Sequence, residues 1–329
     1  MEPLESLTFE QMKYSANDLP KPLYELSSIE LKNKLVISKV TTYVLKYLST
    51  KFVESGFEWF LPVIFSKSTD PLWPDPGASI DKKVSCEIYG ETVSTTTSMI
   101  VHKMVACSLA YPKLFAFSPN IRIEKKERAQ SGVHAYEFTQ LDFEVRYTSA
   151  QDIMSFVEKI FGGLVESIKK DLLEELVGLE RYGCLKAETP FEVYDRNKLV
   201  SKYGDNWANK LVSLSKPVWV TNIPREFYDF EDFKDGCWDN YDLLLPGYGE
   251  VLSGSRREWE YSKIVAKMER DGIRKENYHL LLKLAKEGRL KPSAGAGIGV
   301  ERLVQWIVGA KHIGEVQPFP KVPGIVYDL

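Results

Sequence analysis

The chain has 329 residues, of which 44% are hydrophobic, 12% aromatic and 27% charged, and its formal net charge is −3. This composition is typical of a globular protein with a large core, and the charge excludes a generally basic nucleic-acid-binding surface, although a local basic patch stays open. No apolar run is long enough to cross a membrane, and the acidic N-terminus is unlike a signal peptide. The four cysteines are scattered and form no CxxC pair, which argues against a disulfide framework or a zinc site and fits the reducing cytoplasm.

The N-terminal part of the chain is predicted to be an arm followed by a long helix. Residues 1–27 show little periodicity, whereas the pattern over 28–56 is helical. Ser27 and Glu30 have the spacing of a capping box, which places the start of the helix between them.

A strand and a loop are expected next. The short apolar stretch 57–65 predicts a strand with Pro62 inside it, and proline within a strand indicates a sheet edge or an interface. The stretch 66–80 is predicted to be loop, and a helix is predicted over 99–110.

Two strands and a long helix follow. The stretches 113–127 and 134–147 predict strands joined by a polar loop over 125–133, and 150–176 has the pattern of an amphipathic helix.

The C-terminal half mixes short elements with two clearer helices. Residues 190–242 combine short helices and strands, 241–255 predict a strand, a turn and a strand, and helices are predicted over 255–272 and 275–288. The stretch 293–320 supplies the last strand and helix. Because strands come in blocks and pairs, the chain is predicted to be α+β, with an antiparallel sheet flanked by helices.

One predicted strand carries polar side chains on the face that holds an aromatic. Residues two apart share a face of a strand, so Phe138, Gln140, Asp142 and Glu144 point the same way. For a single strand, a solvated face with salt bridges is the simpler interpretation. The neighbouring strand also carries charge, with Arg122 and Glu124 on one face, and this favours a polar ligand floor.

Glycines alternate at positions 295, 297 and 299 of the last predicted strand, just before Glu301 and Arg302. Alternating glycines let another group approach the backbone closely, although a tightly packed strand gives the same pattern. An arginine in the first turn of a helix opposes the helix dipole unless an anion lies nearby. The pattern therefore favours a flat or phosphorylated ligand that Arg302 helps to hold.

These segments resemble the catalytic domain of class II aminoacyl-tRNA synthetases, in the aspartyl/asparaginyl branch. GAGIGVER resembles the third class II motif, and IRIE…HAYEFTQLDFE resembles the second. GEVLSGSRRE resembles the Gly-Glu-x-x-Ser-Gly signature of the branch. Pro62 matches the interface proline of the first class II motif. The four motifs stand in the family's order over roughly residues 28 to 324. The resemblance implies an antiparallel sheet that binds a bent ATP, and a homodimer.

The resemblance also implies a role for individual residues at the nucleotide. Phe138 would stack on one adenine face, Arg302 would cover the other, and Arg122 would hold the α-phosphate. The ATP-binding candidates are Arg122, Glu124, Arg128, His134, Phe138, Glu250, Ser253, Gly297, Gly299 and Arg302, with Arg122 and Arg302 as the catalytic pair.

The outer phosphates and the magnesium ion have their own candidates. The resemblance implies that His134 and Arg302 meet the outer phosphates, and that Glu250 and Ser253 help to hold Mg²⁺. Val133 replaces an arginine that usually precedes the histidine, and Arg128 is a possible substitute.

The amino-acid site is expected to take aspartate. Aspartyl members of the branch carry Ser-Pro-Gln-x-x-Lys, and here the segment runs from Ser98 to Lys103, with Ile100 in place of the glutamine. A lysine suits a carboxylate side chain better than an amide. Arg257 resembles the second carboxylate clamp. The aspartate candidates are Ser98, Lys103, Gln140, Asp142 and Arg257, with Gln140 and Asp142 near the substrate ammonium.

Further departures bear on the acceptor. Gly314 and Lys321 replace arginines that usually follow the third motif, and the 27 residues before the first core helix are too few for the OB-fold anticodon-binding domain, which needs about a hundred residues. We therefore expect a single catalytic domain over 28–329.

The chain most resembles the archaeal-type, ammonia-dependent asparagine synthetases related to this branch. In the expected reaction, ATP adenylates aspartate and pyrophosphate is released. Ammonia then displaces AMP from the adenylate, which gives asparagine. Residue 2 is Glu2, so nothing resembles a glutaminase nucleophile and free ammonia is the expected donor, with tRNA and membranes disfavoured as partners. The alternatives are a truncated synthetase that acts on tRNA and a non-catalytic paralogue with a regulatory role.

Overall fold

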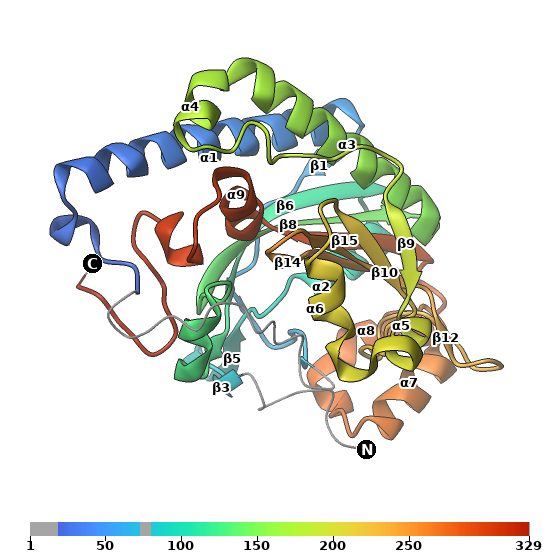
Figure 1. Ribbon diagram of the computed structural model, residues 1–329. Coiled ribbons are helices and arrows are strands. Elements are labelled where there is room, and N and C mark those ends of the chain that lie inside the picture. The colour runs from blue at the N-terminus through green and yellow to red at the C-terminus, as the bar shows by residue number, and fades with distance from the viewer. Residues whose placement is uncertain (1–18, 73–79, 329) are drawn as a thin grey trace.

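The computed structural model describes residues 19–72 and 80–328 (Figure 1). Most of the arm predicted over 1–27 lies outside the described residues. Its described part, 19–27, contains a short 3₁₀ helix, η2 (Leu23–Glu25). Among the described residues, none of the helices combines the length and apolar character needed to cross a bilayer.

A large, mostly antiparallel sheet forms the centre of the molecule. Its order is β1-β6-β8-β15-β14-β13-β10-β9, and only the edge pairs β1–β6 and β9–β10 are parallel. The strands are β1 (Glu58–Trp59), β6 (Lys113–Ile121), β8 (Glu137–Arg146), β9 (Glu192–Asp195), β10 (Val218–Thr221), β13 (Asn240–Leu245), β14 (Gly249–Arg256) and β15 (Ser293–Gly299). The predicted antiparallel α+β fold is confirmed.

Smaller sheets lie around this one. They comprise β2 (Phe65–Ser66) with β4 (Ser85–Ile88) and β5 (Glu91–Thr95), β3 (Ile80–Lys82) with β7 (Ile123–Glu124), and β11 (Glu231–Asp232) with β12 (Cys237–Trp238).

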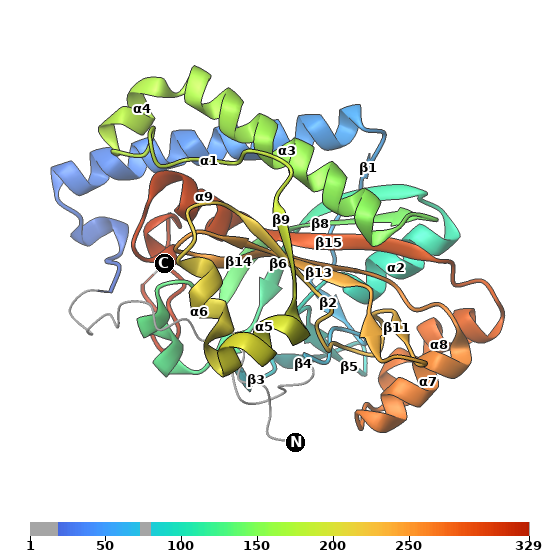
Figure 2. The same cartoon turned by 45° about the vertical axis from the view of Figure 1, so that its right-hand side comes forward.

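Helices cover both faces of the large sheet. α1 and α3 lie side by side across one face with α9 beneath them, whereas α2, α7 and α8 belong to the other face and its far end (Figures 1 and 2). The helices are α1 (Ser28–Glu54), α2 (Ile100–Leu109), α3 (Ala150–Asp171), α4 (Leu173–Gly178), α5 (Arg196–Tyr203), α6 (Trp207–Val212), α7 (Tyr261–Arg270), α8 (His279–Lys286) and α9 (Val300–Val308).

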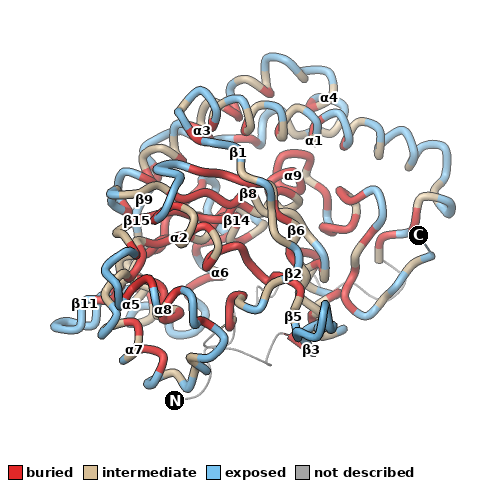
Figure 3. The backbone as a smooth tube through the Cα atoms, turned by 180° about the vertical axis from the view of Figure 1, so that it is seen from behind, coloured by how far each residue is buried: buried red, intermediate tan, exposed pale blue. Residues whose placement is uncertain are grey.

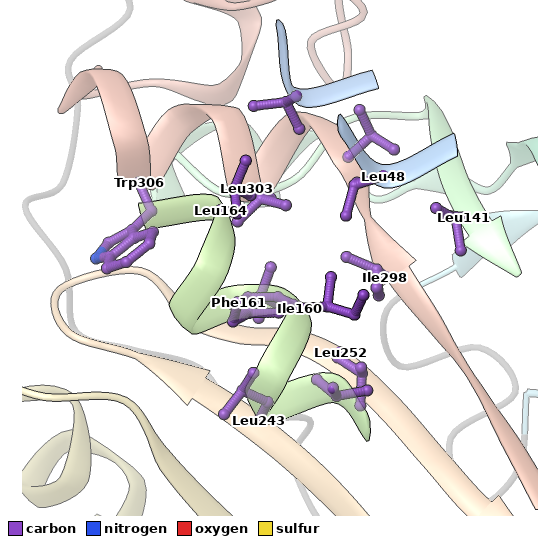
Figure 4. Packing of buried hydrophobic residues seen from close by; sticks show 14 of the residues in the cluster. Leu48, Leu141, Ile160, Phe161, Leu164, Leu243, Leu252, Ile298, Leu303 and Trp306 are labelled. Atoms are coloured by element: carbon purple, nitrogen blue, oxygen red, sulfur yellow. The ribbon is translucent and has the colours of Figure 1, made fainter. Parts of the chain in front are cut away.

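The main core lies between the sheet and the layer of α1, α3 and α9. Leu48, Phe161, Leu164, Ile298 and Leu303 meet there with less than 1% of their surface exposed (Figure 4). Burial of each such side chain stabilises the fold by about 1.5–3 kcal/mol. Figure 3 shows that the central strands are largely buried, whereas α1 has many exposed residues along its length. Because this face is apolar, the polar residues of β8 lie on the opposite face, beside α2.

The boundaries of the first helix confirm the capping signal. The side chain of Ser27 accepts a hydrogen bond from Glu30 N, and the Glu30 carboxylate accepts one from Ser27 N at 2.7 Å. This reciprocal pair satisfies two backbone donors that the helix leaves free.

Several other boundaries differ from the predictions. Pro62 lies between β1 and β2 rather than inside a strand, since the pairing of β1 with β6 ends at Trp59 and Pro62 itself has no N–H to donate. The helix predicted over 255–272 begins only at Tyr261, because 255–256 still pair with β15. The long helix predicted over 150–176 breaks at Leu172.

The polar loop also contains regular structure. A 3₁₀ helix, η3 (Lys126–Ser131), occupies most of the stretch predicted as loop over 125–133. Two further 3₁₀ turns, η4 (Gly204–Asn206) and η5 (Lys275–Tyr278), precede α6 and α8, and η6 (Ile313–Glu315) follows α9.

Candidate active site

The polar row of β8 faces the glycines of β15 across an antiparallel ladder. Gln140 pairs with Gly299, Asp142 with Gly297 and Glu144 with Gly295. The period of two in each strand places all these positions on one face, as the sequence predicted. This face forms the floor of the candidate site.

The space beside two of these glycines is filled by the protein. A Cβ on Gly295 would lie 2.3 Å from Oε2 of Glu144, and one on Gly297 would lie 3.0 Å from Nε2 of Gln140. The expectation that the glycines clear space for a ligand is therefore wrong at Gly295, where a carboxylate needs the room. At Gly299 the nearest atom would be 3.7 Å away, so space remains there.

Lys103 projects from α2 onto this floor and is buried. Its Nζ lies 2.8 Å from Oδ1 of Asp142 and donates to the carbonyl of Ala296 at 2.8 Å. Ser118 donates to the other carboxylate oxygen of Asp142 at 2.6 Å. An ammonium has three N–H donors, so one donor of Lys103 is left for a ligand.

Ser98 and Gln140 are two further candidates for the amino-acid site. Ser98 stands just before α2, and its Oγ accepts a hydrogen bond from Ile100 N at 3.2 Å. Gln140 Oε1 accepts a hydrogen bond from the Asn120 amide at 2.8 Å. The structure thus brings Lys103, Asp142 and Gln140 onto one surface, as the resemblance implied.

Arg257 is also buried, and the protein uses its donors. It pairs with Glu144, with closest approach 3.2 Å, and with Asp229 at 2.9 Å, and it donates to Ser255 Oγ and to Gly295 O. A substrate carboxylate that reaches Arg257 must therefore replace one of these partners. Its role as a clamp stays a prediction.

Arg122 and Phe138 lie in contact at the next part of the site. The Arg122 guanidinium lies 5.3 Å from the centre of the Phe138 ring, a cation–π distance, and its Nε donates to Thr97 O at 3.0 Å. Arg122 falls in the gap between β6 and β7, where the chain leaves the sheet. An adenine stacked on Phe138 would share the ring with this guanidinium.

Arg302 lies in the first turn of α9, as predicted, and donates to two carbonyls. Its guanidinium donates to Glu250 O at 2.5 Å and to Val133 O at 2.6 Å. Burial lowers the pKa of Arg302 from its usual value, while the Glu250 and Glu124 carboxylates act in the opposite direction. In the described part of the chain, no carboxylate forms an ion pair with Arg122 or Arg302.

His134 and Arg128 belong to the same region but differ in charge. Burial, reinforced by Arg128, lowers the pKa of His134 well below its usual value, so the imidazole is neutral at pH 7. Its Nδ1 shares a hydrogen bond with Ser131 Oγ at 2.5 Å. Arg128 pairs with Glu124 at 3.1 Å.

Glu250 and Ser253 lie on β14, beside two residues that sequence reasoning missed. Asp242 of β13 is directly opposite Ser253, and Arg225 pairs with its carboxylate. Burial raises the pKa of Asp242 to about 7, and its Oδ1 is buried without a hydrogen-bond partner among the described residues. Asp242 could have been found from its place in the strand that pairs with the Gly-Glu-x-x-Ser-Gly segment.

The residues around Glu250 fit a magnesium ion that is shared with a nucleotide. The described residues contain no group of three or more His, Cys, Asp or Glu side chains that could hold a metal by themselves. Mg²⁺ commonly takes one or two carboxylates together with substrate phosphates, and an orphaned oxygen of Asp242 near Glu250 meets that need.

The fold and this floor define a class of protein. The model of the tRNA synthetases class II (D, K and N) matches residues 26–323, and the chain belongs to this family. The chain is 28% identical over 288 residues to an asparagine–tRNA ligase of Clostridium botulinum (strain Eklund 17B / Type B), covering 78% of this chain and 60% of the relative. A Mycoplasma mobile asparagine–tRNA ligase is 29% identical over 248 residues, with 66% and 55% covered.

Solved structures show the same fold. Asparaginyl-tRNA synthetase from Pyrococcus horikoshii complexed with asparaginyl-adenylate superposes with a TM-score of 0.80 at 23% identity, covering 94% of this chain and 76% of that one. Aspartyl-tRNA synthetase from Entamoeba histolytica gives 0.71 at 18% identity, covering 99% and 70%. The chain spans about 60% of the length of the first curated relatives that it matches.

Proposed function

We propose that this protein is a ligase that activates aspartate with ATP and transfers the aspartyl group to ammonia, which yields asparagine, AMP and pyrophosphate. The observation that carries the ATP step is the pair Arg122, between β6 and β7, and Arg302, in the first turn of α9 after the glycine strand. Backbone carbonyls accept from both guanidinium groups, and no described carboxylate forms an ion pair with either. Two guanidinium groups without an ion-pair partner at this place favour a polyphosphate ligand.

Different residues bind different parts of the nucleotide during adenylate formation. Arg122 holds the α-phosphate as the carboxylate of the amino acid attacks it and pyrophosphate leaves, and Arg302 covers the adenine that stacks on Phe138. Fixed cations placed around the reacting phosphorus stabilise the charge of the transition state without reorganisation. Mg²⁺, held by Glu250, Ser253 and Asp242, would neutralise phosphate charge.

Aspartate is the proposed amino acid because a buried ammonium faces the floor. Asp142 and Ala296 O take two donors of Lys103, and a substrate carboxylate would accept a charge-assisted hydrogen bond from the third more strongly than an amide would. Calorimetry with each amino acid and a non-hydrolysable ATP analogue tests this assignment. We expect aspartate to bind more tightly than asparagine, and the reverse order would overturn the assignment.

A second candidate has an observation in its favour. The relatives reported above are asparagine–tRNA ligases, which favours a tRNA acceptor for this chain as well. Incubation with ATP, Mg²⁺, amino acid and deacylated tRNA distinguishes the two, since only this candidate predicts an ester on the tRNA.

A further inference from the structure

The guanidinium of Arg257 donates all its hydrogen bonds to the protein itself. Nε and Nη2 donate to Glu144, and Nη2 also donates to Gly295 O at 3.0 Å. Nη1 donates to Asp229 Oδ1 at 2.9 Å and to Ser255 Oγ at 2.6 Å. Because a guanidinium has five N–H donors, none is left for a substrate carboxylate while these partners stay in place.

The group around Arg257 carries more negative than positive charge. Two carboxylates, Glu144 and Asp229, pair with this one guanidinium, and none of the three side chains is more than 5% exposed. Further along the floor, Lys103 and Asp142 balance each other. The amino-acid end of the site therefore has one negative charge in excess, which burial leaves weakly screened and which attracts a ligand cation.

Asp229 is the carboxylate of this group that has an oxygen to offer. Both oxygens of Asp142 and both of Glu144 accept hydrogen bonds from neighbouring side chains. Oδ1 of Asp229 accepts from Arg257 and Ser255, whereas Oδ2 has no hydrogen bond to any described residue. A buried carboxylate oxygen without a donor is costly, so this oxygen suits the ammonium of a ligand.

The backbone holds Asp229 in this position. It forms an isolated β-bridge with Arg257, and its N–H donates to Glu226 O at 3.0 Å. Lys267 of α7, which is fully buried, donates from Nζ to Asp229 O. The carboxylate is therefore a fixed part of the site, so a ligand does not have to order it.

The chemistry of the proposed function determines which end of aspartate lies near Asp229. Asparagine is the amide of the side-chain carboxyl group, so the side-chain carboxylate must attack the α-phosphorus, and pyrophosphate leaves with the electron pair of the broken P–O bond. Ammonia then forms the C–N bond as AMP leaves with the electron pair of the C–O bond, and the surplus proton passes to water. The α-carbon, with its ammonium and its carboxylate, therefore lies away from the phosphorus.

The polar row of β8 gives this orientation two distinct ends. Phe138, in contact with Arg122, stands at one end of the row, and Glu144, paired with Arg257, stands at the other. Aspartate supplies two carboxylates, one for the phosphorus beside Arg122 and one for the third donor of Lys103, whereas asparagine supplies only one.

We propose that Asp229 accepts the α-ammonium of aspartate at Oδ2 and thereby determines which carboxylate is activated. This inference rests on the proposed function. The excess negative charge draws the ammonium to the Arg257 end of the row, which leaves the side-chain carboxylate to reach the phosphorus. The resemblance implied Gln140 and Asp142 as partners of the ammonium, but their oxygens already accept hydrogen bonds from the protein.

Succinate separates this role from a structural one, because it has both carboxylates of aspartate but no ammonium. Wild type and Asp229→Asn are titrated with aspartate and with succinate by calorimetry, in the presence of a non-hydrolysable ATP analogue. The asparagine side chain keeps an oxygen that accepts from Arg257 and Ser255, but it loses the charge. Asp232→Asn, at an exposed position of β11, is the matched control.

We expect Asp229→Asn to raise the Kd for aspartate by about tenfold or more, the loss that follows removal of a hydrogen bond between charged groups. The Kd for succinate should stay within about twofold of wild type, as should both values for Asp232→Asn. With ammonium as the acceptor, Asp229→Asn should also form isoasparagine, the α-amide, because the ammonium no longer fixes the orientation of aspartate.

A crystal structure of the wild type with aspartate and the ATP analogue provides a second test if Asp229→Asn does not fold. The amino nitrogen is expected about 2.7–3.2 Å from Oδ2 of Asp229. An amino nitrogen placed beside Asp142 instead would overturn the inference.

The titrations have their own contrary results. Equal changes in the Kd for aspartate and for succinate would show that Asp229 is structural. An unchanged Kd for aspartate, or tighter binding of both ligands, would show that the carboxylate does not meet the ammonium. Failure of the wild type to form any asparagine from ammonium would instead refute the proposed function, and it is visible before any variant is made.

Discussion

Oε2 of Glu144 occupies the space where a side chain of Gly295 would begin, because a Cβ there would lie only 2.3 Å away. Glu144 in turn binds Arg257 and accepts from Ser293 Oγ at 2.8 Å. The glycine therefore lets a buried ion pair form within the sheet. Gly295 serves the protein's own carboxylate, whereas Gly299 leaves space beside Arg302.

This difference predicts opposite consequences for two alanine substitutions. Gly295→Ala should lower the free energy of unfolding by about 3 kcal/mol or more, since the Cβ would also lie 2.2 Å from Phe143 O. Gly299→Ala should leave stability within about 0.5 kcal/mol but weaken ATP binding. Urea denaturation and ATP titration of both variants test the pair, and similar stability losses would contradict it.

Lys103→Met should destabilise the protein, because it leaves Asp142 buried without its cation. Breaking a buried pair from one side typically costs about 3–5 kcal/mol. The double variant Lys103→Met/Asp142→Leu should recover part of this loss, since it removes both charges. Equal unfolding free energies for wild type and Lys103→Met would show that the pair at 2.8 Å contributes little.

Arg302→Ala should remove AMP formation while the protein stays folded. The loss of one preorganised donor lowers turnover by about 10²–10³-fold. Arg302→Lys is the matched control, and it should retain the charge but lose the two-carbonyl geometry. Turnover of Arg302→Ala close to that of wild type would remove this residue from the site.

The protein is predicted to be a homodimer through α1 and the segment around Pro62. Leu61 is 83% exposed and Trp59 56% exposed, which suits an interface. Leu61→Asp should shift the sedimentation coefficient towards a monomer, whereas Leu280→Asp on α8, where Leu280 is 56% exposed, should not. A wild type that sediments only as a monomer would refute the prediction.

The contribution of Glu301 to the free energy of unfolding should decrease as pH rises. Both its oxygens accept from Thr139 N at 2.9 Å, and burial raises its pKa to about 7. The folded state therefore keeps a proton that the unfolded state releases, so this stabilisation is full below about pH 4.5 and is lost as pH rises through about 7.

The loss should amount to about 3 kcal/mol at most. Chemical denaturation of wild type and Glu301→Gln between pH 5 and 8 measures it as a difference that changes with pH. A constant difference would show that Glu301 has an ordinary pKa.

The sequence predicted the elements whose signals are local. The capping box at Ser27 and Glu30 and the shared face of Gln140, Asp142 and Glu144 follow from neighbours in the chain. The order of four motifs also predicted the family correctly, and the family model spans residues 26–323.

Features that depend on pairing between distant segments were not predictable in this way. Arg257 was expected in a helix, but it follows a strand because 255–256 pair with β15. The partners of Gly295 became known only with the register of β8 and β15. Asp242 carries no motif of its own, and its place beside the Gly-Glu-x-x-Ser-Gly segment appears only when β13 and β14 are paired.

The identity of the product tests the central proposal most directly. The protein is incubated with ATP, Mg²⁺ and aspartate, together with either ammonium or deacylated tRNA, and the products are identified by mass spectrometry. We predict free asparagine, AMP and pyrophosphate with ammonium, and no amino acid esterified to tRNA. An aminoacyl ester on the tRNA, with no asparagine formed from ammonium, would contradict the proposed function.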